Sequence, residues 1–408
     1  MSNKFLFSNA IKTSKIKKAL LIVCSLVISF VSAQTKGALV PIGINYTINS
    51  KILKQDREIQ IYVPEDYHQS NEKCPVIYVF DSQKFFLNAI AYQQNLRFND
   101  ESPGFIVVGI KTINTERSKL YNTKSLKFSN FLENELIPFI DGNYRTLKSE
   151  RVFFGWERAA AFGVEVLASK PNLFKAYFIA SPTFLTAKRM ADIGILLDKS
   201  TVLNNYLYFT LAEVEAWSLS STNNLAELLN KKARNKLKWK YDLFKDENHY
   251  TTTIATMNNG LKSIFRDYAP IRYYSIKEFR NVGGVKGLNK LFQNRGERYQ
   301  MSKAVHSDTK RDLFLLAVRE NDFLVFTELE KEFPSFLTSF SRDVMFERFG
   351  QFYVENKAYE SAISYYKFGL QTNPNSTRLH NRLGEAYKPA GKIKESNKAF
   401  KKALQETH

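Results

Sequence analysis

The chain has 408 residues, of which 44% are hydrophobic and 24% are charged, and this composition excludes a wholly disordered protein. At roughly 100–200 residues per domain, the length is sufficient for two or three domains. Its net charge is +19, but five of the lysines lie within the first 33 residues and the rest of the excess is spread along the chain, so nucleic acid is not an expected partner.

Residues 1–33 have the pattern of an export signal. A lysine-rich stretch ends at Lys18, an apolar run covers residues 19–31, and the segment closes with Val-Ser-Ala at Ala33. The apolar run is shorter than the ~20 residues that a membrane-spanning helix needs. We therefore predict cleavage between Ala33 and Gln34, and a mature chain that is periplasmic or extracellular and has no transmembrane segment.

Cysteine and histidine usage gives no indication of a metal site, and no cofactor is expected. Cys24 lies in the predicted signal, which leaves Cys74 as the one thiol of the mature chain and no internal disulfide. Cys74 precedes a predicted strand, where packing as a small apolar residue is the expected role. The five histidines are too far apart in the sequence to form a local zinc motif.

Residues 43–270 alternate between strand and helix patterns. Residues 58–63 alternate polar and apolar side chains, as a half-buried strand does, and continuous apolar runs follow at 76–80 and 105–108. Residues 129–140 have helical spacing of apolar side chains. Four further strands are predicted at residues 151–154, 176–179, 206–211 and 238–244. This order predicts a mostly parallel sheet with crossover helices and an antiparallel edge formed by the opening strands.

The C-terminal part contains an internal repeat. We interpret residues 271–342 as a connecting region that is helical in its second half, followed by two repeats at residues 343–408. Large and small residues recur at an offset of 34 in the pairs Phe349/Leu383, Gly350/Gly384, Tyr353/Tyr387, Ala362/Ser396, Tyr366/Phe400 and Gly369/Ala403. This period matches the tetratricopeptide pattern, and such helical repeats bind protein partners, so a protein partner is predicted here.

Several blocks of the first domain occur in an order that resembles an esterase family of the α/β-hydrolases, which includes siderophore esterases and feruloyl-esterase-like proteins. The blocks are REIQIYVPEDY at 57–67, PVIYVFDSQKFF at 75–86, FIVVGI at 105–110, NFLENELIPFID at 130–141 and RVFFGWERAAAFG at 151–163. The resemblance covers about residues 43–268. It implies an α/β-hydrolase fold for a domain at residues 34–270, and a serine esterase activity.

The catalytic motif of that family, G-x-S-x-G, is altered. The turn reads Gly155-Trp156-Glu157-Arg158-Ala159-Ala160, so Glu157 occupies the nucleophile position. A carboxylate there would repel a developing oxyanion. The turn residue also takes a positive φ in the family, which costs a non-glycine residue about 1–3 kcal/mol. The turn therefore either persists under strain or relaxes.

The resemblance also implies roles for other residues. His249 matches the family's catalytic base, with a merely polar loop residue as the alternative. The acid follows the strand at 206–211, where Glu213 and Glu215 are both candidates. The cleft and the oxyanion-side loop would involve Asp81, Ser82, Gln83, Trp156 and Arg158; alternatively, Asp81 is a turn residue bonded to nearby backbone. Ser181 precedes a proline and matches a family serine that is not the nucleophile.

Two kinds of function follow from this pattern. In the first, the chain is an exported, non-catalytic esterase-like protein that binds a ligand in the cleft or serves as a scaffold. In the second, it is a hydrolase of esters, epoxides or related substrates, with Glu157 as carboxylate nucleophile or acid/base and His249 as base. The fold alone does not distinguish the two, because function depends on the site.

Overall fold

The computed structural model describes residues 42–406 of the chain. The predicted export signal, residues 1–33, lies outside the described residues. None of the helices between residues 42 and 406 is both long enough and apolar enough to cross a membrane.

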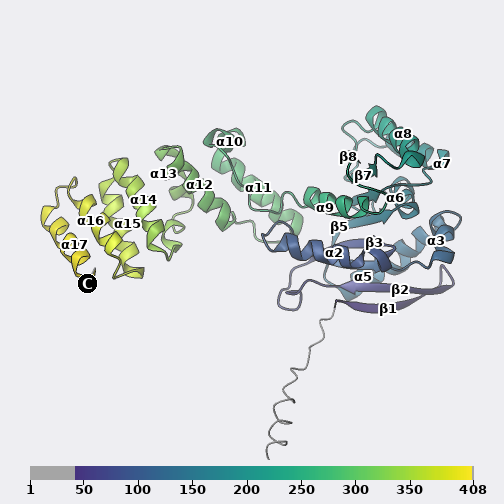
Figure 1. The fold of residues 1–408 in the computed structure, drawn as a ribbon, viewed down its shortest axis with the longest axis horizontal. Helices are drawn as coiled ribbons and strands as arrows, with labels where there is room; N and C mark the ends of the chain where they lie inside the picture. Colours follow the sequence, from purple (N-terminus) through teal and green to yellow (C-terminus); the bar gives the residue numbers. More distant parts are fainter. Residues whose placement is uncertain (1–41, 407–408) are drawn as a thin grey trace, which may run out of the picture. The chain divides into compact units, whose positions relative to one another are not determined.

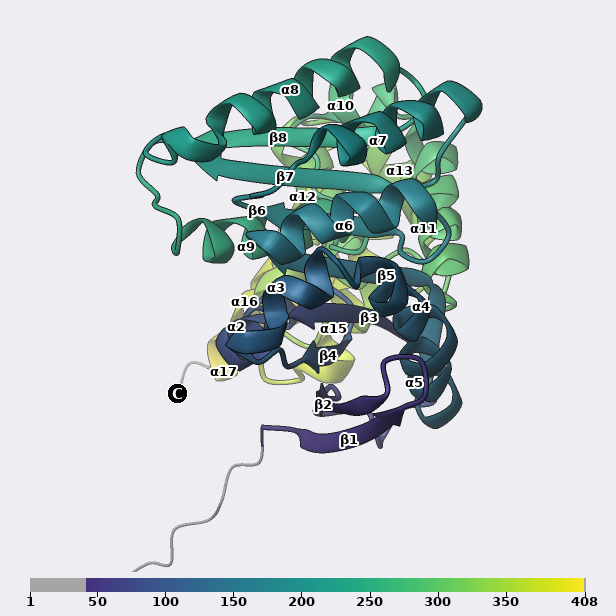
Figure 2. The ribbon, with the colours of Figure 1, turned by 90° about the vertical axis from the view of Figure 1, so that its right-hand side faces the viewer.

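Residues 44–244 build one sheet of eight strands in the order β1-β2-β4-β3-β5-β6-β7-β8. In Figure 2 these strands follow one another from β1 at one end of the domain to β8 at the other. Their bounds are β1 Ile44–Ser50, β2 Gln55–Tyr62, β3 Cys74–Phe80, β4 Ile106–Ile110, β5 Thr146–Trp156, β6 Ala176–Ala180, β7 Tyr206–Ala212 and β8 Lys238–Phe244.

The pairing confirms the predicted mostly parallel sheet. Strands β3 to β8 pair in parallel, whereas β1 with β2 and β2 with β4 are antiparallel, as expected for the opening strands. All residues of β3 and β4 are buried, because helices cover both faces of the sheet there. Cys74 is a buried free thiol at the start of β3, and burial raises its pKa to about 11.

Helices cover the two faces with separate apolar cores. One core joins α4, α5, α6, α7 and α8 to the sheet, and the other joins α2 and α9 to its opposite face. The bounds are α2 Ser82–Arg97, α3 Asn114–Tyr121, α4 Ser125–Phe131, η1 Leu132–Leu136, α5 Ile137–Asn143, α6 Arg158–Ser169, α7 Ala187–Lys199, α8 Ala216–Lys232 and α9 Thr252–Ile264.

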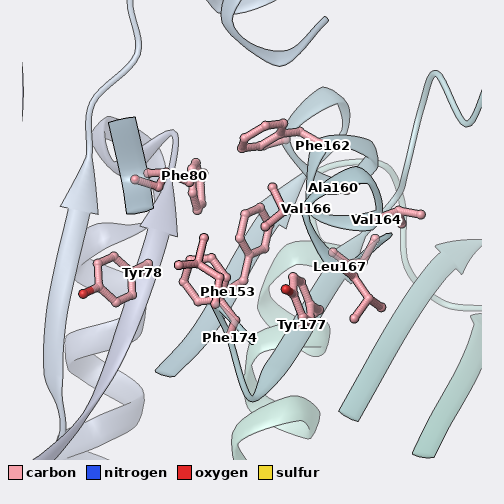
Figure 3. Close-up of a cluster of buried hydrophobic side chains, with 14 of the residues drawn as sticks. Tyr78, Phe80, Phe153, Ala160, Phe162, Val164, Val166, Leu167, Phe174 and Tyr177 are labelled. Carbon is pink, nitrogen blue, oxygen red and sulfur yellow. The ribbon is translucent and has the colours of Figure 1, made fainter. Parts of the chain in front are cut away.

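Aromatic packing holds α6 against the central strands (Figure 3). Phe80 of β3 and Phe153 of β5 stack with ring centroids 4.2 Å apart, and both contact Phe162 of α6. The side chains of Val164, Val166 and Leu167 are fully buried as well. Since α6 begins directly after β5, this packing fixes the direction in which the chain turns between them.

The C-terminal region is all-helical and has its own apolar core (Figure 1, green to yellow). Helices α14 and α16 begin 34 residues apart, as do α15 and α17. The bounds are α10 Ile276–Asn281, α11 Gly284–Tyr299, α12 Ser307–Arg319, α13 Phe323–Glu332, η2 Leu337–Ser339, α14 Asp343–Glu355, α15 Tyr359–Thr372, α16 Thr377–Tyr387 and α17 Ile393–Gln405.

The connecting region, residues 271–342, differs from the prediction. Helix was expected only in its second half, but α10 and α11 occupy the first half too. Because glycine disfavours helix, the glycines of α11 weaken the prediction of this helix from the sequence. At Gly287, an added Cβ would lie only 1.7 Å from the carbonyl oxygen of Val282, so the close approach of the chain requires glycine. Tyr299 at the end of α11 packs against Tyr268 and Phe265 in the core of the first domain.

The close approach of α6 to β5 predicts a specific cost for enlarging Gly155. A Cβ there would lie 2.8 Å from the backbone carbonyl of Ala159, which cannot move without displacing the helix. Gly155→Ala should lower the free energy of unfolding by about 1–3 kcal/mol in urea titrations. Gly142→Ala in α5 is the control, since no described atom lies within 4 Å of its added Cβ. Equal stability of the two variants would contradict this account.

Candidate functional site

The carboxyl ends of the parallel strands bring the candidate residues to one edge of the sheet. Glu157 directly follows β5, Glu215 lies just beyond the end of β7, and His249 is in the loop after β8. Because β5, β6, β7 and β8 are parallel neighbours, these three positions share an edge although they are far apart in the sequence.

Glu215 and His249 form a hydrogen-bonded pair, in which the glutamate is buried and the histidine is partly exposed. His249 Nδ1 lies 2.6 Å from Glu215 Oε2, and the Glu215 side chain is fully buried. Burial raises the pKa of Glu215, but hydrogen bonds from His249, Ser181 and the N–H of Ala212 outweigh it and the net pKa lies below the ordinary value. An ionised carboxylate only accepts, so Nδ1 carries the proton and Nε2 is left as the basic nitrogen.

Of the two candidate acids, Glu215 is therefore the one that contacts His249. The Glu213 side chain is exposed, and within residues 42–406 it forms no hydrogen bond with the histidine. In the sequence, both glutamates simply follow the same strand. They differ in the direction of their side chains, which the sequence does not show.

Ser181 supports this pair. Its Oγ donates to Glu215 Oε1 at 2.7 Å and lies 2.6 Å from Thr252 Oγ1, and the residue is fully buried. Because its hydroxyl is fully buried and donates to the Glu215 carboxylate, Ser181 acts as a positioning residue for Glu215.

Glu157 occupies a strained turn between β5 and α6. Its φ of 58° and ψ of −114° are rarely adopted by a residue other than glycine and cost about 1–3 kcal/mol. The turn has not relaxed, because the surrounding backbone holds it: the N–H of Glu157 donates to the carbonyl of Ala180 at 3.0 Å, and its carbonyl accepts from Thr183 at 3.3 Å. The fully buried Ala159 and Ala160 are accommodated without disturbing this geometry.

Arg117 of α3 bridges two carboxylates at this edge. It donates to Glu157 Oε2 at 2.6 Å through Nη1, and to Asp81 Oδ2 at 2.8 Å through Nη2. The Asp81 side chain is fully buried, whereas that of Glu157 is 23% exposed. Burial alone would lower the pKa of Arg117, but the hydrogen bonds and charges of Asp81 and Glu157 raise it above its usual value, so the guanidinium stays charged. We call Asp81, Arg117 and Glu157 the ion triplet.

The sequence interpretation did not include Arg117. In the sequence, Arg117 is one of many basic residues in a polar segment, and nothing in its spacing marks it. Asp81 is not the turn residue of the alternative interpretation, since its carboxylate bonds to side chains: besides Arg117, Thr112 and Tyr121 donate to it. Asp81 precedes α2 in a left-handed conformation, just as Glu157 precedes α6 with a positive φ.

The other residues that were predicted to line the cleft mainly hold neighbouring parts of the chain in place. Ser82 donates to Gln60, and Gln83 exchanges two hydrogen bonds with the backbone of Thr112. Trp156 Nε1 donates to the carbonyl of His249 at 2.8 Å, and its ring lies 4.8 Å from the imidazole. These bonds hold the loops around the turn and the histidine.

Arg158 is a weaker partner of Glu157 than Arg117 is. Its Nε lies 3.9 Å from Glu157 Oε1, and its guanidinium covers the ring of Phe184 at 3.9 Å. Adjacent residues at the start of a helix do not face one another, which accounts for the longer distance.

The edge thus holds a hydrogen-bonded Glu215–His249 pair and, at the turn between β5 and α6, an ion-paired carboxylate. Among the described residues, no hydrogen bond connects Glu157 with His249, and no group of three or more His, Cys, Asp or Glu side chains could hold a metal ion.

Comparison with known proteins agrees with the esterase-like fold of the first domain. The family model described as "Putative esterase" matches residues 50–255, half of the chain. None of the curated protein sequences matches the chain.

Two solved structures illustrate the similarity of fold. An IroE-like serine hydrolase from Shewanella oneidensis is 21% identical, with a TM-score of 0.55 over 71% of this chain and 98% of that one. An uncharacterised protein from Capnocytophaga ochracea is 18% identical, with a TM-score of 0.60 over 82% and 99%. At such identities the likeness concerns the fold: an α/β-hydrolase-like, mostly parallel sheet followed by helices. On the match to its family model, this chain belongs to the Putative esterase family.

Proposed function

We propose that this protein is a non-catalytic member of its family that binds a ligand at the altered site or serves as a scaffold. The observation that carries the proposal is the ion triplet. An esterase needs a hydroxyl that gives its proton to the base, and here the corresponding carboxylate is bonded to a guanidinium.

The electrostatics of Glu157 support the absence of ester hydrolysis. An ester carbonyl that is attacked at this edge develops a negative charge, and the charge of Glu157 opposes it. The bond to Arg117 also lowers the electron density that the carboxylate could offer as a nucleophile. His249 therefore retains a basic nitrogen without a hydroxyl partner at the turn.

A second candidate is a hydrolase with Glu157 as carboxylate nucleophile or acid/base. The paired Glu215 and His249 favour it, since a base that activates water is what such a mechanism needs after a covalent intermediate forms. The retained strain at Glu157 favours it too, because strained residues often cluster at working sites.

The proposal includes export and a protein partner. Export is supported by the lysine-rich and apolar pattern of residues 1–33. A partner that binds tetratricopeptide-like repeats is supported by the 34-residue offset between the starts of α14 and α16, and of α15 and α17. A small-molecule ligand would bind at the ion triplet, where the Glu157 side chain is partly exposed.

The first test restores the nucleophile. The natural protein and Glu157→Ala should hydrolyse p-nitrophenyl acetate only at the background rate. Glu157→Ser should exceed it by about 10²-fold or more, because the base contributes at least that much. Glu157→Ser combined with His249→Gln is the matched control and should return to background.

Two results would contradict the non-catalytic proposal. The first is robust turnover of short esters or epoxides by the natural protein that Glu157→Ala abolishes. The second is a substrate-derived adduct on Glu157 in mass spectra of the trapped protein, which would establish the carboxylate mechanism.

The second test concerns the ion triplet itself. Arg117→Met leaves Asp81 buried without a counter-charge and should lower the free energy of unfolding by about 3–5 kcal/mol in urea titrations. Arg158→Met, one residue from Glu157 but more exposed, should cost less than about 1 kcal/mol. Asp81→Asn combined with Arg117→Met should recover part of the loss. Equal effects of the two arginine substitutions would show that the triplet does not hold the turn.

A further inference from the structure

A second concave surface lies at the opposite edge of the sheet from Glu157 and His249. It is a groove of about 1280 Å³ at the amino ends of β6, β7 and β8, and the residues after α9 and the last turn of α11 complete it. With seven residues in β7 at ~3.3 Å each, the groove and the candidate site are separated by about the length of a strand. We call it the amino-edge groove.

The lining of the amino-edge groove is strongly basic. Two acidic residues, Glu150 and Glu297, line it together with six basic ones: Lys175, Arg234, Lys238, Lys240, Arg266 and Arg298. Arg298 is paired with Glu150 at 2.6 Å, and Lys240 with Asp242 at the same distance. Glu297 pairs with Lys303 outside the lining.

Four of these cations belong to none of the ion pairs formed by the described residues. In the described part of the chain, Lys175, Arg234, Lys238 and Arg266 form no ion pair; Lys175 donates to the amide oxygen of Asn204. Strand pairing aligns Ala176 with Tyr206 and Tyr206 with Lys238, so the backbones at Lys175 and Lys238 are about two strand spacings, ~10 Å, apart. The charges are therefore close enough to act on one ligand.

Mutual repulsion is already present among these groups. Burial lowers the pKa of Lys175, and the charges of Arg298 and Lys238 lower it further, whereas Glu150 and Asp267 oppose this effect. An anion bound among these cations would favour their charged forms.

Protection of the sheet edge does not account for the whole cluster. Lysines on an edge strand discourage pairing with another chain, and Lys238 and Lys240 lie on the edge strand β8. Lys175, however, precedes the interior strand β6, and Arg266 follows α9. Three separate parts of the chain, before β6, at the start of β8 and after α9, thus bring unpaired positive charge to one concavity.

We propose that the amino-edge groove binds a soluble oligoanion, a ligand with two or more linked phosphate or carboxylate groups. Spaced cations match spaced anionic groups, and arginine and lysine are the side chains that bind both. The volume is above the usual 300–1,000 Å³ of small-ligand pockets, which fits a ligand of several units. A concave lining suits a ligand that enters it better than a flat membrane surface.

Isothermal titration calorimetry on the purified protein tests this proposal, with tripolyphosphate and propane-1,2,3-tricarboxylate as probes and inorganic phosphate as the single-anion reference. At least one probe should bind with a stoichiometry of one and more tightly than phosphate. Lys238→Gln combined with Arg266→Gln should weaken that binding by about 10-fold or more. Lys398→Gln combined with Lys401→Gln removes the same charge from exposed positions of α17 and should change the affinity less than about 2-fold.

Three results would overturn the proposal. One is the absence of saturable binding of both probes. Another is an equal loss of affinity in the groove pair and the α17 pair, which would mean that the net charge of the protein attracts the probes. The third is retention on phosphatidylglycerol vesicles that Lys238→Gln and Arg266→Gln abolish while neither probe binds, which would identify the groove as a membrane contact.

Discussion

The interaction on which the site depends is the bond of one guanidinium with two carboxylates. Asp81 is fully buried, and a buried carboxylate without a counter-charge is strongly unfavourable, so Arg117 has to remain where it is. Asp81 follows β3 and Glu157 follows β5, and these strands are parallel neighbours. The same arginine therefore reaches both carboxylates and secures the charged side chain of the turn residue.

This arrangement explains how the turn persists with glutamate in it. The positive φ of Glu157 is imposed by its surroundings: the packing of α6 on β5, the close approach at Gly155, and the bonds of the Glu157 backbone to Ala180 and Thr183. A change of side chain does not relieve a backbone constraint of that kind. The charge that the glutamate introduces is compensated by Arg117, so the fold accepts a carboxylate at this turn.

The other half of the site is independent of Glu157. Glu215 is held by Ser181, the N–H of Ala212 and His249, and none of these contacts involves the turn residue. Glu215 and His249 are thus held in place by hydrogen bonds of their own. This independence does not distinguish the two candidate functions, because a retained base is compatible both with a carboxylate mechanism and with a site that has only kept its scaffold.

The fold class and the position of the altered turn could be predicted from the order of residues alone. Apolar runs mark β3 and β4 because strands buried on both faces admit no polar side chain, and the order of blocks places Glu157 at the turn after β5. His249 was assigned through the same resemblance. The helix α11 was not predicted, because its glycines are required by close contacts in the folded chain that the sequence pattern does not show.

Only the tertiary structure decided which side chains meet. The choice of Glu215 over Glu213 depends on side-chain direction at the end of β7, and the role of Arg117 depends on where α3 lies relative to β3 and β5. The amino-edge groove depends on the pairing of β6, β7 and β8, which gathers cations from distant parts of the sequence. Periodicity in the sequence predicts which single residues are buried. Charge pairing depends on which residues the sheet brings together, and this becomes visible only in the folded chain.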